Sequence, residues 1–208
     1  MPSVWADSEE VEFTDEIPVD PSHVYELLMG AVSEQGRAII KFEVDGKDAL
    51  SEGEFPSSYE KIEATTLSHD ELTLRLVLES VKQFANTEEH LQAYLNNILT
   101  IGWSEVFKRM DEFIQKVQPF ADLLDNLGPY VGTYDPAWRV DFEKIASRQS
   151  ETLGGILEAF EQGNPALLSD ELAVNFIPVF RSAMKLLRET TIPFLQEKVS
   201  TEKKEMLS

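Results

Sequence analysis

Residues 153–180 read LGGILEAFEQGNPALLSDELAVNFIPVF, and this stretch decides the fold of the C-terminal part of the chain. On both sides of its centre, apolar residues recur every three or four positions, which is the spacing of one face of an amphipathic helix. At the centre, Gly163 provides a turn, and Asn164-Pro165 has the residue types of a helix N-cap and first helical position. The stretch therefore predicts two antiparallel helices joined by a short turn.

A similar helical hairpin is predicted earlier in the chain. Ser68 and Glu71 form a capping box at the start of a region with helical apolar spacing. Gly102 interrupts the pattern, and Pro119 is expected to kink the second helix or to mark a join within it, because proline lacks an N–H group. The turns at Gly102 and Gly163 lie 61 residues apart. A duplicated hairpin is one interpretation, and the alternative is that any two amphipathic hairpins share periodic leucines.

Residues 127–138 are predicted to link the two hairpins. This segment contains two glycines beside Pro129, a composition typical of loops, and ends with Asp135-Pro136, which is expected to cap the next helix. Four main helices with short turns indicate a mostly antiparallel bundle.

The N-terminal segment has a different character. Residues 1–20 carry seven acidic residues and no basic residue, a composition that disfavours independent folding. We expect an acidic flexible arm, which Trp5, Phe13 and Ile17 could anchor to a groove in this molecule or in a neighbour. Asp20-Pro21 then predicts the start of a short helix.

A change of period after this helix predicts a small sheet. Ile40, Phe42 and Val44 alternate with their neighbours, as in a strand with one buried face, and Asp45-Gly46 suits a tight hairpin turn. Residues 59–66 resume the alternating pattern. We predict a meander of two or three strands, and so small a sheet must pack against a helix to be stable.

The predicted fold class is α+β, predominantly α: a small N-terminal helix and a β-hairpin or meander packed on a C-terminal antiparallel four-helix bundle of two helical hairpins. The predicted parts are an acidic flexible arm at 1–20, a small α/β unit at 21–68, a helical bundle at 69–200 with hairpins at about 69–126 and 136–198, and a frayed tail at 201–208.

Composition excludes several classes of function. The 208 residues include 38 acidic and 18 basic side chains, a formal charge of −20 that repels nucleic-acid phosphates and anionic membranes. Without cysteine there is no disulfide framework, thiolate metal site or cysteine nucleophile. No run approaches the roughly 18 apolar residues of a membrane-spanning helix, and the first residues do not resemble a signal peptide, so we expect a cytoplasmic protein.

No motif indicates catalysis, a metal or a cofactor. The Glu-x-x-His pairs of di-metal bundles are absent, and so are nucleotide-binding and nucleophile-elbow patterns. The best polar cluster is Glu88, Glu89 and His90, but acids in a first helical turn are explained by the helix dipole. Gly154 and Gly155 lie within a helical pattern, where we expect them to permit close packing or a bend.

Aromatic residues provide the candidate partner surface, which comprises Trp103, Tyr130, Tyr134 and Trp138. Aromatic side chains on loops are common in binding surfaces. The alternative is that they close the open end of the bundle core, because large aromatic side chains bury much apolar area.

These observations favour a non-enzymatic protein-interaction module, such as an adaptor or a chaperone-like binder of a basic or amphipathic segment. An alternative is a helical-bundle enzyme, or a protein that binds a small ligand or metal with groups that converge only in three dimensions. A second alternative is a structural, self-associating protein. No cofactor, nucleic acid or membrane is expected as a partner.

Overall fold

The computed structural model describes residues 2–14 and 16–205. Met1 and Asp15, in the predicted arm, and residues 206–208, in the predicted tail, lie outside the described residues. The chain contains a five-stranded sheet and a larger set of helices, so the fold is α+β and predominantly α, as predicted.

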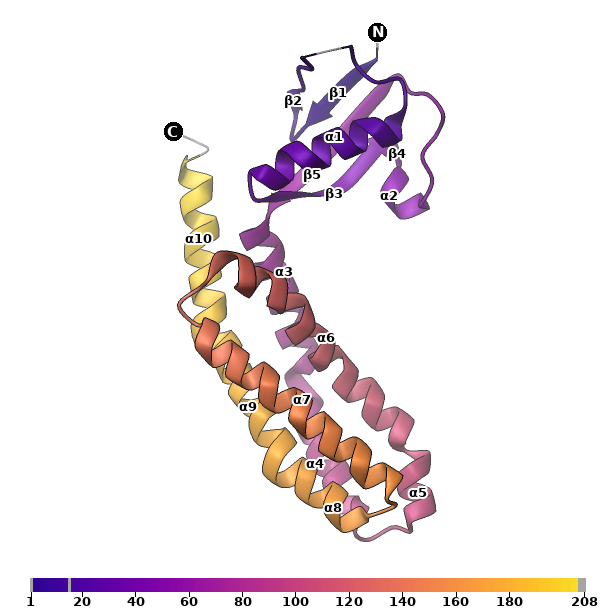
Figure 1. Ribbon diagram of the computed structural model, residues 1–208, viewed down its shortest axis with the longest axis vertical. Coiled ribbons are helices and arrows are strands. Elements are labelled where there is room, and N and C mark those ends of the chain that lie inside the picture. The colour runs from indigo at the N-terminus through magenta and orange to yellow at the C-terminus, as the bar shows by residue number, and fades with distance from the viewer. Residues whose placement is uncertain (1, 15, 206–208) are drawn as a thin grey trace. The chain divides into compact units, whose positions relative to one another are not determined.

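Two compact units divide the chain, a sheet unit at Met1–Leu72 and a bundle unit at Thr73–Ser208 (Figure 1). In the sheet unit the strand order is β2-β1-β5-β3-β4, with β1 parallel to β5 and the other pairs antiparallel. One helix, α1 (Pro21–Glu34), packs on the sheet. The strands are β1 (Ser3–Ala6), β2 (Glu9–Glu10), β3 (Arg37–Val44), β4 (Lys47–Asp48) and β5 (Lys61–Ser68), and a short helix, α2 (Ala49–Glu52), follows β4.

The sheet is larger than the sequence predicts, because the segment expected to be an arm supplies β1 and β2. Val4 on β1 is fully buried in the core of this unit. Asp7, in the turn after β1, fixes the hairpin to the rest of the sheet. Its carboxylate accepts a hydrogen bond from the Thr66 backbone N–H at 2.7 Å and another from the Arg37 guanidinium at 2.9 Å. One acidic residue of the predicted arm therefore has a specific structural contact.

The predicted pattern of β3 is correct at Phe42 and Val44, which are buried, and wrong at Ile40, which is 39% exposed. A register shift in the pairing of β3 with β5 lies between Ile39 and Lys41. An irregularity of this kind interrupts the two-residue alternation. As a result Ile39, rather than Ile40, packs on the core.

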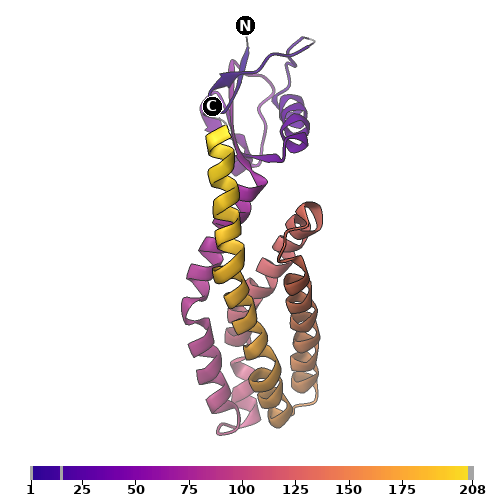
Figure 2. The same ribbon diagram turned by 90° about the vertical axis from the view of Figure 1, so that its left-hand side faces the viewer.

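The bundle unit consists of helices that run up and down its long axis (Figures 1 and 2). Helix α3 (His69–Gln83) begins in the sheet unit and continues into this one. The other elements are η1 (Phe84–Asn86), α4 (Thr87–Ile98), α5 (Trp103–Lys108), α6 (Met110–Tyr134), α7 (Arg139–Glu161), α8 (Pro165–Asp170), η2 (Glu171–Phe176), α9 (Ile177–Leu186), η3 (Leu187–Thr191) and α10 (Ile192–Glu205). The element η1 is a 3₁₀ turn, whereas η2 and η3 are π-helical.

The predicted linker at 127–138 is wrong. Helix α6 continues through Pro119 and Pro129 to Tyr134, because burial of side chains such as Leu127 and Val131 overrides the poor helix propensity of glycine and proline. Asp135, predicted to start the next helix, instead ends α6 in the left-handed conformation, with φ 44°.

Three predicted helix caps are present. The Asp20 side chain accepts a hydrogen bond from the Ser22 backbone N–H, and the Asn164 side chain accepts one from the Leu167 backbone N–H. The Ser68 hydroxyl accepts a hydrogen bond from the backbone N–H of Glu71 at 3.2 Å. These bonds satisfy N–H groups that have no partner within the first helical turn.

The chain is helical from Pro165 to Glu205, but two π-helical turns interrupt its α-helical pattern. Nine of the buried positions here form one stripe with an average spacing close to four residues: Leu168, Leu172, Phe176, Phe180, Met184, Leu187, Thr191, Leu195 and Val199. An α-helix has 3.6 residues per turn, so this spacing would carry the buried stripe around the helix. The π-helical turns η2 and η3 contain more residues per turn than an α-helix, so they keep the buried stripe on one face of the helix.

Candidate functional site

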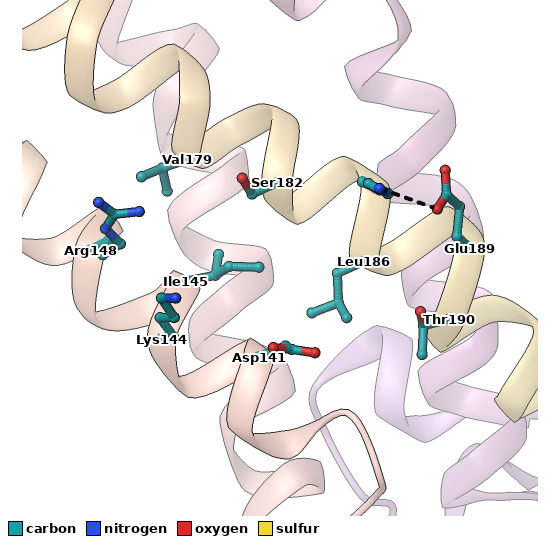
Figure 3. A pocket seen from close by; sticks show the side chains of 10 residues that line it. Asp141, Lys144, Ile145, Arg148, Val179, Ser182, Leu186, Glu189 and Thr190 are labelled. Carbon is teal, nitrogen blue, oxygen red and sulfur yellow. Dashed lines mark ion pairs between the residues drawn. The ribbon is translucent and has the colours of Figure 1, made fainter.

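Helix α7 borders a charged groove, which we call the α7–α9 groove (Figure 3). Its cavity has a volume of about 330 Å³. The lining residues are Asp141, Lys144, Ile145 and Arg148 from α7, and Val179, Ser182, Lys185, Leu186, Glu189 and Thr190 from α9 and η3. The π-helical turn η3 therefore forms part of its wall.

The floor of the α7–α9 groove is apolar and its rim is charged. Ile145 and Val179 are buried, and Figure 3 shows Ile145 and Leu186 facing each other across the groove. Three cationic side chains share this space, in contrast to the strongly acidic chain as a whole. Lys185 lies 3.9 Å from the Glu189 carboxylate, a loose and exposed ion pair.

A second cavity of about 280 Å³ shares Arg148 and Val179 with this groove. Here Gly155 of α7 faces Glu171 of η2. A Cβ atom at position 155 would lie 2.7 Å from the Glu171 Cδ atom, closer than real side chains approach. A side chain at position 155 would therefore displace the Glu171 carboxylate, whereas Gly154 has open space at the same position.

On another side of α7 lies an apolar groove, the α6–α7 groove, with a volume of about 160 Å³. Its lining residues are Met110, Phe113, Ile114, Val117, Gln118, Ala121, Leu153, Ile156, Leu157 and Phe160. Leu157 belongs to the helical apolar pattern of residues 153–180, yet it is 59% exposed, and Ile114 from α6 is 45% exposed beside the same groove.

The charged residues next to the α6–α7 groove are acidic. Asp122 accepts a hydrogen bond at 2.7 Å from Gln118, which lines the groove. Glu158 and Glu161 follow Leu157 by one and four positions on α7 and are exposed. The stretch 150–161 contains no basic residue. The groove is therefore an apolar strip with an acidic border.

The polar cluster predicted from the sequence is divided in the structure. Glu88 pairs with Arg181 at 2.6 Å, joining α4 to α9, and this hydrogen bond raises the pKa of Arg181. His90 instead lines a cavity of about 210 Å³ between α4 and α6, together with Tyr94. Within residues 2–14 and 16–205, no group of three or more histidine, aspartate or glutamate side chains is placed to hold a metal ion.

The Tyr94 hydroxyl is a weaker acid than that of an exposed tyrosine. Burial raises the pKa of its hydroxyl to about 12, and the nearby Arg109 partly opposes this effect. The Tyr94 ring stacks on Phe113, and its hydroxyl donates to the Val106 carbonyl at 3.4 Å. Tyr94 is therefore a neutral packing residue near neutral pH.

The four aromatic residues predicted to form a partner surface lie at two ends of the bundle unit. Trp103, at the start of α5, packs on Phe160, whereas the other three lie at or near the turn from α6 to α7 (Figure 1). Trp138 is 2% exposed and stacks on Tyr130 with ring centroids 6.3 Å apart. Only Tyr134 of this group is largely exposed. Trp138 and Tyr130 thus belong to the core.

No helix within the described residues is both long and apolar enough to cross a membrane. No protein-family model, curated protein or solved structure matches the chain. The two grooves along α7 were not identified from the sequence. The Lys144/Arg148 pair in an acidic chain is a sequence signal for the α7–α9 groove, whereas the exposure of Leu157 becomes visible only in the structure.

Proposed function

We propose that this protein is a non-enzymatic protein-interaction module, and that its α6–α7 groove binds the apolar face of a basic amphipathic helix. The observation that carries the proposal is the pair Ile114 and Leu157, two exposed large apolar side chains that line one groove.

Binding would remove these two side chains from water. A helix recognised in a groove inserts apolar residues at positions i, i+3, i+4 and i+7. Burial stabilises such a complex by about 25 cal/mol per Å² of apolar surface removed from water. The apolar strip supplies this contact, because its lining is almost entirely aliphatic and aromatic.

Charge selects the kind of helix. Asp122, Glu158 and Glu161 lie beside the strip, and the chain carries a charge of −20. Complementary charge speeds encounter and disfavours acidic partners. A helix with lysine or arginine flanking its apolar face fits both features.

The test uses the full chain and a synthetic peptide of about 18 residues, long enough to form a helix, with leucines at helical spacing and lysines elsewhere. Fluorescence anisotropy should show binding that weakens as salt screens the acidic border. Leu157→Asp should reduce the affinity about tenfold or more, the loss expected for one buried leucine.

Val140→Asp is the matched control, because Val140 is also an exposed apolar residue of α7 but does not line this groove. It should leave binding unchanged. Equal binding of a peptide with the same composition in scrambled order, or of one with glutamate in place of lysine, would contradict the proposal. A dimer that Leu157→Asp dissociates, seen by sedimentation, would assign the groove to a second copy of the chain instead.

A further inference from the structure

We propose that the α7–α9 groove is a binding site for a small amphiphilic anion, a carboxylate or phosphate monoester on a short apolar body. This site is separate from the α6–α7 groove and does not depend on the proposed protein partner.

The anionic group is expected at Lys144 and Arg148. These residues lie four positions apart on α7, so they share one helix face, and both line the same cavity (Figure 3). Like charges at this spacing destabilise a helix slightly. Neither side chain forms an ion pair within the described part of the chain, although acidic residues outnumber basic ones by about two to one. An anionic ligand would neutralise both.

The apolar body is expected over Ile145, Val179 and Leu186, which line the space beside the two cations. A cavity of about 330 Å³ is at the lower end of the size range of small-ligand pockets. It has room for about ten non-hydrogen atoms if each occupies the ~30 Å³ of a liquid water molecule. A bare inorganic anion would leave this surface uncovered.

The acidic residues of the groove set the orientation. Asp141 precedes Lys144 by three residues on α7, on the side away from Arg148, and Glu189 is occupied by Lys185. Repulsion from Asp141 disfavours an anionic head at that end of the groove. At the other end, Glu151 and Glu171 line the adjoining cavity with Arg148. The head is therefore expected between Lys144 and Arg148, with the body directed toward Leu186.

The test measures binding to the full chain by titration calorimetry, with ligands kept below micelle-forming concentrations. Octanoate and octyl phosphate are the two anionic probes, and the tighter of the two identifies the head group. Octyltrimethylammonium has the same body with a cationic head, whereas acetate and inorganic phosphate have an anionic head with little or no body. Only the two amphiphilic anions should bind measurably.

Variants locate the site. Lys144→Gln with Arg148→Gln should weaken octanoate binding about tenfold, since each exposed charge contact contributes ~0.7 kcal/mol. Lys116→Gln, a lysine beside a different cavity, should leave it unchanged, and so should Leu157→Asp in the α6–α7 groove. Equal affinity for octyltrimethylammonium, or no loss in the double variant, would overturn the proposal. Loss of octanoate binding in Leu157→Asp would also overturn it, by placing the ligand in the other groove.

Discussion

The buried hydroxyl of Thr191 lowers the stability of the folded protein. Its side chain is fully buried in the π-helical turn η3, and its hydroxyl has no hydrogen-bond partner among residues 2–14 and 16–205. Thr152 of α7, by contrast, donates to the Arg148 carbonyl one turn earlier at 2.7 Å. A buried hydroxyl without a partner costs about 1–3 kcal/mol.

Thr191→Val should therefore stabilise the protein by about 1 kcal/mol, because it keeps the shape of the side chain and removes the unpaired hydroxyl. Urea denaturation followed by circular dichroism measures the change. Thr191→Ser, which keeps the hydroxyl and removes the methyl group, should destabilise. Destabilisation by Thr191→Val would show that the hydroxyl has a stabilising partner, such as a buried water molecule.

The raised pKa of Tyr94 predicts that the folded protein loses stability at high pH. Burial raises the pKa of its hydroxyl from 10 to about 12, so the unfolded chain loses this proton at a lower pH than the folded one. The stability that Tyr94 contributes is complete below pH 10 and is lost as the pH rises from 10 to 12. Tyr94→Phe should lose less stability than the natural protein between pH 9 and pH 12 in urea denaturation. Equal losses in the two proteins would contradict this assignment.

Single residues that pack across the fold could not be recognised from the sequence. Asp7 lies in a segment whose acidic composition is typical of a flexible arm. Its carboxylate nevertheless accepts hydrogen bonds from Thr66 and Arg37, which are 59 and 30 positions away in the sequence. Gly155 lies opposite the Glu171 carboxylate, a neighbour that the sequence pattern does not reveal. In both cases the partner is distant in sequence, and local patterns hold no information about it.

At the level of elements, each π-helical turn is followed by proline. Pro178 and Pro193 are the second residues of α9 and α10. The Ile177 N–H donates to the Leu172 carbonyl, and Pro178 has no N–H. The Ala173 carbonyl therefore lacks both the α-helical and the π-helical donor that the chain could give it.

Pro178→Ala should stabilise the protein by about 1–2 kcal/mol, because alanine restores an N–H donor and has a higher helix propensity. Thermal and urea denaturation measure this effect. Pro165→Ala is the matched control, since Pro165 occupies the first turn of α8, where proline is well tolerated. A loss of stability in Pro178→Ala would show that the rigid proline ring stabilises η2 more than the missing bond destabilises it.

The predicted elements agree best with the structure where local signals suffice. Helix caps at Asp20 and Asn164 and the hairpin turn at Asp45-Gly46 follow from residue type alone. The continuation of α6 through Pro129 was missed, because it depends on burial that only the assembled bundle provides. The π-helical turns did leave a signal in the sequence, because apolar residues recur every four positions from Leu168 to Met184, which differs from the 3.6-residue period of a regular α-helix.

Over the whole molecule, negative charge is concentrated in the sheet unit. Its 72 residues contain 18 acidic and four basic side chains, a formal charge of −14, whereas the 136 residues of the bundle unit have a formal charge of −6. Repulsion within the sheet unit opposes its compact state, and salt screens this repulsion. The two units are therefore expected to differ in their response to salt.

Hydrogen exchange of the full chain, read segment by segment by mass spectrometry, measures this difference. Raising sodium chloride from about 20 to 500 mM, across which the screening length falls several-fold, should increase protection in β1, β3 and β5 more than in α6, α7 and α9. Potassium chloride at the same ionic strength serves as a control for a specific sodium effect. Equal changes in both sets of elements would contradict the prediction.

The α+β class follows from the sequence because helical and strand periods occupy separate parts of the chain. The full sheet does not, because its parallel pair joins Ser3–Ala6 to residues 61–64. Pairing over such a distance has no local signature. The grooves along α7 also depend on how the helices meet, and the sequence periodicity does not show that Leu157 is exposed beside one of them.

The π-helical turns also affect how the chain tolerates changes in length. Deleting one residue from a regular α-helix rotates every later side chain by about 100° relative to the earlier ones, which moves the buried face to the surface. A π-helical turn already holds one residue more than an α-helical turn between bonded groups. Losing a residue such as Asn175 from η2 would convert that turn to the regular form and keep Phe180 and Met184 directed inward. The C-terminal helix therefore has two places, η2 and η3, at which the gene can lose a codon without changing the face that packs in the bundle.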